Sequence, residues 1–240
     1  MHKYYSALAL LLFVMFQSSC KKDKEALTCR LSTWEVSGQT YYYTYNSQGF
    51  VERMSVSNSS SYIVYTQSGN LLTSQAYDST GTAIGTPAVR QVNADGYYSM
   101  IPGSSDTTYL TYNAAGQLLT YVRRNDTIIS QSTFTYENGD MVKAISLKSD
   151  SSISSIATYD HYTDRVNNTN LNVSIDLLEP RYGKPNRHLL KSSTTSNSSG
   201  NIDFNTFYYE FDENGNPVSL QLIRQPGNDI SNLKFTYGCE

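Results

Sequence analysis

Basic side chains concentrate in one stretch of the chain, between residues 165 and 191. This stretch holds five of the 14 basic residues that follow position 27, one histidine and only two acidic residues. Guanidinium and ammonium groups bind carboxylates and phosphates, and nearby tyrosines can hydrogen-bond a sugar. The cluster could therefore hold an anionic head group or an acidic sugar, and the alternative is a solvated loop that offsets the protein's negative charge. The candidate ligand-binding residues are Tyr159, Tyr162, Arg165, Lys184, Arg187 and His188, and Arg181 and Lys191 complete the cluster.

Aromatic residues alternate along two predicted strands. Alternate residues of a strand lie on one face, so each set forms a strip of rings. Such strips suit a glycan-binding surface, because a ring can stack on a sugar while its hydroxyl hydrogen-bonds. The alternative is core packing, and solvent exposure discriminates between the two. The strips are Tyr41, Tyr43 and Tyr45, and Phe207, Tyr209 and Phe211.

Two cysteines, Cys29 and Cys239, lie near the two ends of the predicted folded region. In an oxidising compartment an even pair favours a disulfide. The bridge requires the first and last strands to be neighbours, and it would close a loop of about 210 residues. The alternative is two buried free thiols. Scattered cysteines and histidines match no zinc spacing, so we expect no metal site.

Motifs for catalysis are missing from the sequence. It contains no Gly-x-Ser-x-Gly elbow, no His-Glu-x-x-His and no glycine-rich phosphate loop. Residues 212–215, Asp-Glu-Asn-Gly, fit a hairpin turn better than a calcium loop. A pair of glycosidase carboxylates has no fixed spacing, so it could hide among the acidic residues. We expect a protein that is not an enzyme and uses no cofactor.

The charge of the chain argues against binding to nucleic acid. Setting aside four lysines and two acidic residues before position 28 leaves 14 basic and 19 acidic residues, a net charge of −5. Proteins that neutralise phosphates are basic. Charged residues are only 16% of the chain, and 21 of its residues are tyrosine. This composition disfavours helical bundles and coiled coils and favours a β-sheet protein.

The first 19 residues predict a secretory signal peptide. A basic Lys3 precedes ten consecutive apolar residues, 7–16, which are too few to span a bilayer. Residues 17–20, Gln-Ser-Ser-Cys, resemble the lipobox of bacterial lipoproteins, in which the peptide is cut before a cysteine that carries lipid. We therefore expect lipidation at Cys20. Residues 20–28 then form a charged tether that resembles the export tags of surface lipoproteins of Gram-negative gut bacteria.

One turn pattern recurs along the rest of the chain. Alternating stretches of aromatic and hydroxyl residues end in a short polar turn with glycine, after which a second apolar stretch begins. Glycine adopts the positive φ that tight hairpin turns need, and Asn or Asp favours the turn. The pattern predicts a long antiparallel meander in a single domain, residues 29–240. The turn glycines are Gly49, Gly69, Gly96, Gly116, Gly139 and Gly215.

The turn pattern fails between residues 149 and 199, which we expect to form an irregular insert. Residues 149–155 and 192–199 are rich in serine, and Gly183 and Pro185 interrupt the part between them. Residues 167–178 have enough apolar positions for one short helix. The predicted fold is therefore all-β and mainly antiparallel. It is a large curled meander sheet or half-barrel, with one or two short helices in its concavity.

The chain resembles a known family over residues 31–237. The repeated Tyr-x-Tyr-x-x-x-Gly hairpins are followed by residues 159–167, Tyr-Asp-His-Tyr-Thr-Asp-Arg-Val-Asn, and 183–191, Gly-Lys-Pro-Asn-Arg-His-Leu-Leu-Lys. Together they resemble the secreted lipoproteins of the domain of unknown function 4595 family. The resemblance implies a porter-like fold, similar to lipoprotein-localisation factors, with short helices inside a half-barrel. It implies no activity and no catalytic residues. The Tyr-x-x-x-Gly-x-Leu rhythm also resembles the Tyr-Asp (YD) repeats of large secreted shells.

Two functions follow as expectations. The first is an outer-membrane lipoprotein that binds a lipid-like, hydrophobic, amphipathic or glycan ligand in the concavity of its sheet. The second is a structural or adhesive surface protein, as in YD-repeat proteins, that contacts a partner through its sheet and loops. The lipid at Cys20 would attach either protein to the membrane, at the cell surface or facing the periplasm. An open apolar groove would favour the first, and a filled concavity the second.

Overall fold

The computed structural model describes residues 29–169, 171 and 180–239. Three predicted features lie outside these residues. They are the signal peptide at residues 1–19, the lipidated Cys20 with its tether to residue 28, and most of the predicted helix, at residues 172–178.

The described residues form sixteen β-strands, each of which pairs with its sequence neighbours. Their bounds are β1 Cys29–Val36, β2 Gln39–Tyr45, β3 Val51–Val56, β4 Tyr62–Ser68, β5 Leu71–Tyr77, β6 Ala83–Val92, β7 Tyr98–Pro102, β8 Thr107–Tyr112, β9 Leu118–Arg124, β10 Ile128–Glu137, β11 Asp140–Lys148, β12 Ile153–Val166, β13 His188–Asn197, β14 Ile202–Phe211, β15 Pro217–Gln225 and β16 Asp229–Cys239.

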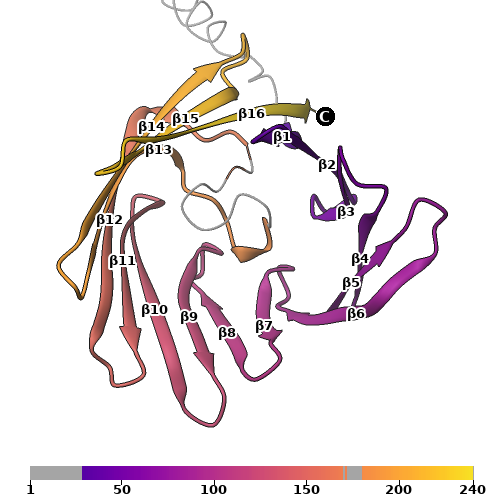
Figure 1. The fold of residues 1–240 in the computed structure, drawn as a ribbon, viewed down its shortest axis with the longest axis horizontal. Helices are drawn as coiled ribbons and strands as arrows, with labels where there is room; N and C mark the ends of the chain where they lie inside the picture. Colours follow the sequence, from indigo (N-terminus) through magenta and orange to yellow (C-terminus); the bar gives the residue numbers. More distant parts are fainter. Residues whose placement is uncertain (1–28, 170, 172–179, 240) are drawn as a thin grey trace, which may run out of the picture.

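The strands form a closed antiparallel barrel. Every strand is hydrogen-bonded to the next, and β16 returns to pair with β1 from Cys29↔Cys239 to Val36↔Leu233 (Figure 1). The prediction of an antiparallel meander is confirmed. The prediction of a half-barrel or open curled sheet is wrong, because pairing between the first and last strands removes both sheet edges.

The alternation of residue types along the strands explains how the wall forms. On β16, Leu233 and Phe235 are buried inside, while Asn232, Lys234 and Thr236 are exposed. Successive side chains of a strand point to opposite faces, so over these residues β16 has an apolar inner face and a polar outer face.

A single turn geometry connects many of the strands. In residues 46–50, Asn46 Oδ1 accepts hydrogen bonds from the backbone N–H groups of Gln48 and Phe50, both at 3.0 Å. Gly49 adopts a φ of 85° and donates to Asn46 O at 2.9 Å. The turns at 93–97, 113–117 and 212–216 repeat this arrangement. The predicted glycine turns are thus confirmed at these positions.

Hairpin turns alternate between the two ends of the barrel. The turns that follow β2, β4, β6, β8, β10 and β14 share one end with the start of β1 and the end of β16. The described residues of the long connection from β12 to β13, which are 167–169, 171 and 180–187, lie at the same end. We call these residues the crossover and this end the crossover end.

The predicted irregular insert, residues 149–199, is wrong in most of its length. Residues 153–166 form β12 and residues 188–197 form β13, so only the crossover and two short turns are irregular. Hydroxyl-rich strands are stable here because each is hydrogen-bonded on both sides within the closed sheet. The described part of the crossover contains one 3₁₀ turn, Pro180–Tyr182. No helix in the described residues has the length and apolar character needed to cross a bilayer.

The crossover lies within the ring of strands (Figure 1). Its Leu171 belongs to an apolar cluster with side chains of β1–β3 and β13–β16, including Trp34 and Phe207. Its Tyr182 packs against a second cluster formed by β5–β9, which includes Leu72 and Tyr98. The concavity of the sheet is therefore filled at this end by packed side chains.

Candidate functional site

The crossover is fixed to the turns at its end of the barrel by backbone hydrogen bonds. Lys184 N donates to Gly116 O at 2.8 Å, and Arg187 N donates to Gly139 O at 3.1 Å. The side-chain oxygen of Asn186 accepts a bond from Met141 N at 2.8 Å. The crossover thereby has a defined position against the turns that follow β8 and β10.

Arg181 joins the crossover to two further turns. This side chain is buried, with 4% exposure, and its Nη1 donates to Gln67 Oε1 and Gly96 O, both at 3.0 Å. The guanidinium carbon lies 4.4 Å from the centroid of the Phe50 ring, a cation–π contact. Arg181 therefore joins the turns after β2 and β6 and the last part of β4 at the crossover end.

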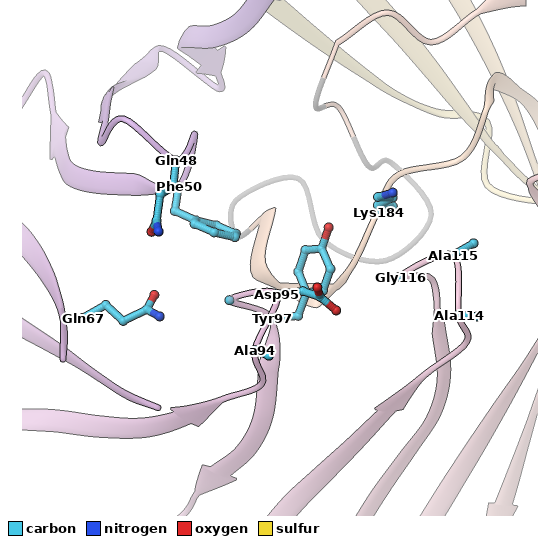
Figure 2. A pocket seen from close by; sticks show the side chains of 11 residues that line it. Gln48, Phe50, Gln67, Ala94, Asp95, Tyr97, Ala114, Ala115, Gly116 and Lys184 are labelled. Atoms are coloured by element: carbon cyan, nitrogen blue, oxygen red, sulfur yellow. The ribbon is translucent and has the colours of Figure 1, made fainter. Parts of the chain in front are cut away.

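A pocket of about 410 Å³ opens where these turns meet the crossover (Figure 2). Equivalent positions of the repeated turn supply its wall, because residues 46–50, 93–97 and 113–117 have the same hydrogen-bonded geometry. Gln67 of β4 and Lys184 of the crossover approach from opposite sides. We call it the rim pocket. The side chains that line it include Gln48, Phe50, Gln67, Asp95, Tyr97 and Lys184.

Two aromatic rings form the apolar part of the rim pocket. Phe50 and Tyr97 meet edge to face, with centroids 6.2 Å apart and an interplanar angle of 83°. Tyr97 also packs against Tyr112, whose hydroxyl donates to Tyr98 O at 2.7 Å. Burial, and to a lesser degree the charge of Asp95, raises the pKa of Tyr97. Tyr97 is therefore a neutral hydrogen-bonding phenol at physiological pH.

The polar part of the rim pocket is solvent-facing. Gln48, Asp95 and Lys184 are exposed, whereas the rings of Phe50 and Tyr97 are half-buried between them. One carboxylate and one ammonium group leave the lining with no net charge. Amide, phenol and charged groups around two ring faces can bind a small polar molecule that also has an apolar face. Among the described residues, no group of three or more His, Cys, Asp or Glu side chains is placed to bind a metal.

The predicted basic cluster is dispersed in the structure. Lys184 lines the rim pocket, but Arg187 is exposed outside it. His188 is held by Asp140, whose Oδ1 accepts from His188 N and whose Oδ2 lies near Nδ1, both at 2.7 Å. Arg165 lies on β12, with its guanidinium carbon 4.7 Å from the Phe211 ring centroid. Lys191 pairs with Asp160 on the exposed surface.

The predicted tyrosines and aromatic strips contribute mainly to the barrel core. Tyr159 packs against the first apolar cluster, which also contains the buried Tyr43 and Phe207. Tyr162 donates its hydroxyl to Phe207 O at 2.9 Å and meets Tyr209 edge to face. Because Tyr41, Tyr45 and Tyr209 also pack on this cluster, core packing is the correct alternative for both strips.

Five side chains that line the rim pocket were not predicted from the sequence: Gln67 of β4 and four residues of the repeated turns, Gln48, Phe50, Asp95 and Tyr97. The signal for the four turn residues is present in the sequence, because each occupies the third or fifth position of the repeated Asn-x-x-Gly-x turn. That pattern predicted the hairpins correctly. It could not show that the turns after β2, β6 and β8 converge beside the crossover.

Cys29 is disulfide-bonded. Its backbone lies directly opposite that of Cys239 across the β1–β16 ladder. This position meets the requirement of the predicted Cys29–Cys239 bridge, that the first and last strands be neighbours. The pairing itself stays a prediction.

Comparisons with known proteins identify the fold and no more. No family model and no curated protein matches the chain. The structure is similar to a porin-like protein from Bacteroides uniformis, with a TM-score of 0.59 and 16% identity over 87% of this chain and 96% of that one. It is also similar to a porin-like protein from Bacteroides vulgatus, with a TM-score of 0.60 and 13% identity over 87% of this chain and 98% of that one.

Proposed function

We propose that the protein is a non-enzymatic binding protein of the cell envelope, attached by a lipid at Cys20, that holds a saccharide in the rim pocket. The observation that carries the proposal is the convergence of three equivalent turns on one pocket with two aromatic rings. A volume of about 410 Å³ lies in the range of small-ligand sites. Ring faces beside amides and a phenol suit the alternating apolar and hydroxyl surfaces of a sugar.

The polar outward-facing residues of β16 support a barrel tethered in water. Barrels that span membranes are apolar outside and polar inside. On β16 the inner face carries Leu233 and Phe235, and the outer face carries Asn232, Lys234 and Thr236 beside the exposed Ile230. In the proposed function the lipid at Cys20 attaches the protein to the membrane, and the barrel is the scaffold that positions the crossover end.

The packed side chains inside the crossover end favour a saccharide over a hydrophobic ligand. A lipid-like molecule in the concavity would have to displace the packed clusters around Trp34 and Phe207 and around Leu72 and Tyr98. Displacing packed core side chains costs several kcal/mol per large residue, on the order of a core truncation. The rim pocket requires no such displacement.

The test measures saccharide binding by the full mature chain. Native mass spectrometry of protein purified from its own cell envelope first shows whether a glycan is bound. Titration of the protein with the glycan released by denaturation then measures the affinity. Tyr97→Ala should weaken binding by about tenfold or more, equivalent to about 1.4 kcal/mol, because it removes the central ring. Tyr42→Ala is the matched control, since Tyr42 is 46% exposed on the outer face of β2. Equal effects of the two substitutions would contradict the proposal.

A second candidate function, contact with a protein partner, rests on the outer face of β14. Ile202, Phe204 and Tyr208 are 63%, 38% and 51% exposed along this single strand. Large apolar side chains that gather on a surface favour protein contacts. A chain that binds no saccharide but loses a partner on Phe204→Ser would support this alternative.

A further inference from the structure

The rim pocket and the start of the barrel lie at the same end of the molecule. β1 begins at Cys29, whose Sγ lies 3.8 Å from Asn216 Nδ2 in the turn after β14. That turn belongs to the crossover end, as do the turns that line the rim pocket. The chain between Cys20 and Cys29 therefore joins the barrel at the end that carries the pocket.

The extended tether is about as long as the barrel wall. Eight residues separate Cys20 from Cys29, and a fully extended chain of this length spans about 28 Å. A strand of nine residues, such as β11, is about 30 Å long. A lipid at Cys20 would thus hold the start of β1, and with it the crossover end, within about one barrel length of the bilayer.

The wall of the pocket is close to this attachment point. Phe50 follows Gly49 in the turn after β2, and β2 pairs directly with β1. The space beside Gly49 is occupied by the guanidinium group of Arg30, about 3.1 Å from where a Cβ would lie. The Phe50 wall of the pocket is therefore next to the first residues of β1.

We infer that the rim pocket faces the membrane that holds the lipid anchor and binds the uncharged sugar head group of a lipid in that membrane. The inference rests on the proposed saccharide site and on lipidation of Cys20. Gln48, Asp95 and Lys184 are exposed, so the polar mouth of the rim pocket opens to solvent at the crossover end. One positive and one negative group suit a neutral head group better than a polyanionic one.

The first experiment measures orientation. Full-length lipidated protein is reconstituted in vesicles of phosphatidylethanolamine and phosphatidylglycerol that contain a fluorescent acceptor lipid. A donor dye is attached at Ser47→Cys or at Ser198→Cys. The two serines are exposed at the second position of the same turn type, at opposite ends of the barrel. Energy transfer from position 47 should be at least about twice that from position 198, because transfer falls with the distance to the bilayer. Equal or reversed transfer overturns the inference.

The second experiment identifies the source of the sugar. A photo-crosslinking digalactosyl lipid is placed in the same vesicles, and a photo-crosslinking free digalactoside is offered separately. Crosslinking to the lipid should fall about tenfold in Tyr97→Ala and stay unchanged in Tyr42→Ala. Crosslinking of only the free sugar, dependent on Tyr97, would retain the proposed function and overturn the membrane-facing inference. If neither the lipid probe nor the free-sugar probe crosslinks, both the proposed function and the membrane-facing inference are overturned.

Discussion

Arg181 has a structural role at the crossover end. Its buried guanidinium donates hydrogen bonds to Gln67 and Gly96 and makes a cation–π contact with Phe50, so it holds these lining residues in position. Sequence alone grouped it with Lys184 and Arg187 as a basic cluster, because charge along the chain does not distinguish a buried side chain from an exposed one. Only the packing around each residue separates these roles.

Arg181→Ala should lower the free energy of unfolding by about 2–4 kcal/mol, since it removes two charge-assisted hydrogen bonds and leaves Gly96 O without this donor. Arg187→Ala is the control. Its side chain is exposed, so the loss should stay below about 0.5 kcal/mol. Urea unfolding measures both, and similar losses would contradict the role given to Arg181.

Buried tyrosines should make the protein sensitive to alkali. Burial is the largest cause that raises the pKa of Tyr112, Tyr136 and Tyr209 well above the ordinary value of 10.0. A folded-state pKa above the unfolded one stabilises the fold below pH 10, and that stability is lost as the pH rises further. The loss for Tyr209 should be about 1.4 kcal/mol per pH unit. Unfolding measured from neutral pH to above pH 10, with phenolate absorbance followed in parallel, checks this.

Tyr209→Phe provides the matched variant. The Tyr209 hydroxyl has no hydrogen-bond partner among the described residues, so its removal should leave stability at neutral pH unchanged or slightly higher and reduce the alkaline loss. In contrast, Tyr112→Phe removes a bond to Tyr98 O and should cost about 1 kcal/mol at neutral pH. The opposite ranking would show that the Tyr209 hydroxyl is satisfied in solution.

At the scale of elements, the repeated turns were predictable and the hydroxyl-rich strands were not. Glycine with a preceding Asn or Asp signals a hairpin locally, wherever the hairpin lies in the fold. β13 instead consists largely of serine and threonine, for example from Ser192 to Ser196. Its stability comes from its neighbours β12 and β14 on both sides, and no pattern within the strand records that pairing.

Gly96 is the turn glycine whose substitution should be most costly. Its φ is 82°, and an added Cβ would lie 2.5 Å from two ring atoms of Phe50. Gly96→Ala should destabilise the protein by about 2–3 kcal/mol, through the left-handed backbone and the displaced ring. Gly215→Ala shares a φ of 83° but meets nothing within 4 Å, so its loss should be about 1 kcal/mol. Thermal unfolding ranks the two, and equal losses would show that the Phe50 ring moves away freely.

At the scale of the whole molecule, closure of the barrel was the feature that sequence did not predict. Alternation and turns specify neighbouring strands, whereas closure depends on β1 and β16, about two hundred residues apart. The two terminal cysteines were the only local sign of this contact. The resemblance to the domain of unknown function 4595 family stays a prediction, since the similar solved structures show the fold alone.

Cys239→Ser should lower the free energy of unfolding by about 2–5 kcal/mol if Cys29 and Cys239 are bridged, because the disulfide restricts a loop of about 210 residues in the unfolded chain. Reduction of the wild type should cost the same amount, and reduction of the variant should cost nothing further. Urea unfolding with and without reductant measures this. An intact mass that does not fall by two hydrogens on oxidation would rule out the bridge.

Closure of the ring also sets the order of events when the chain folds. β1 is the first strand of the barrel and β16 the last, so β1 has an unpaired edge until the end of the chain arrives. An exposed edge is a template for pairing with other chains, and contacts of such long sequence separation form slowly. The partly folded protein would therefore be most prone to aggregation just before β16 pairs with β1. If Cys29 is bridged to Cys239, formation of that disulfide would mark the end of this stage.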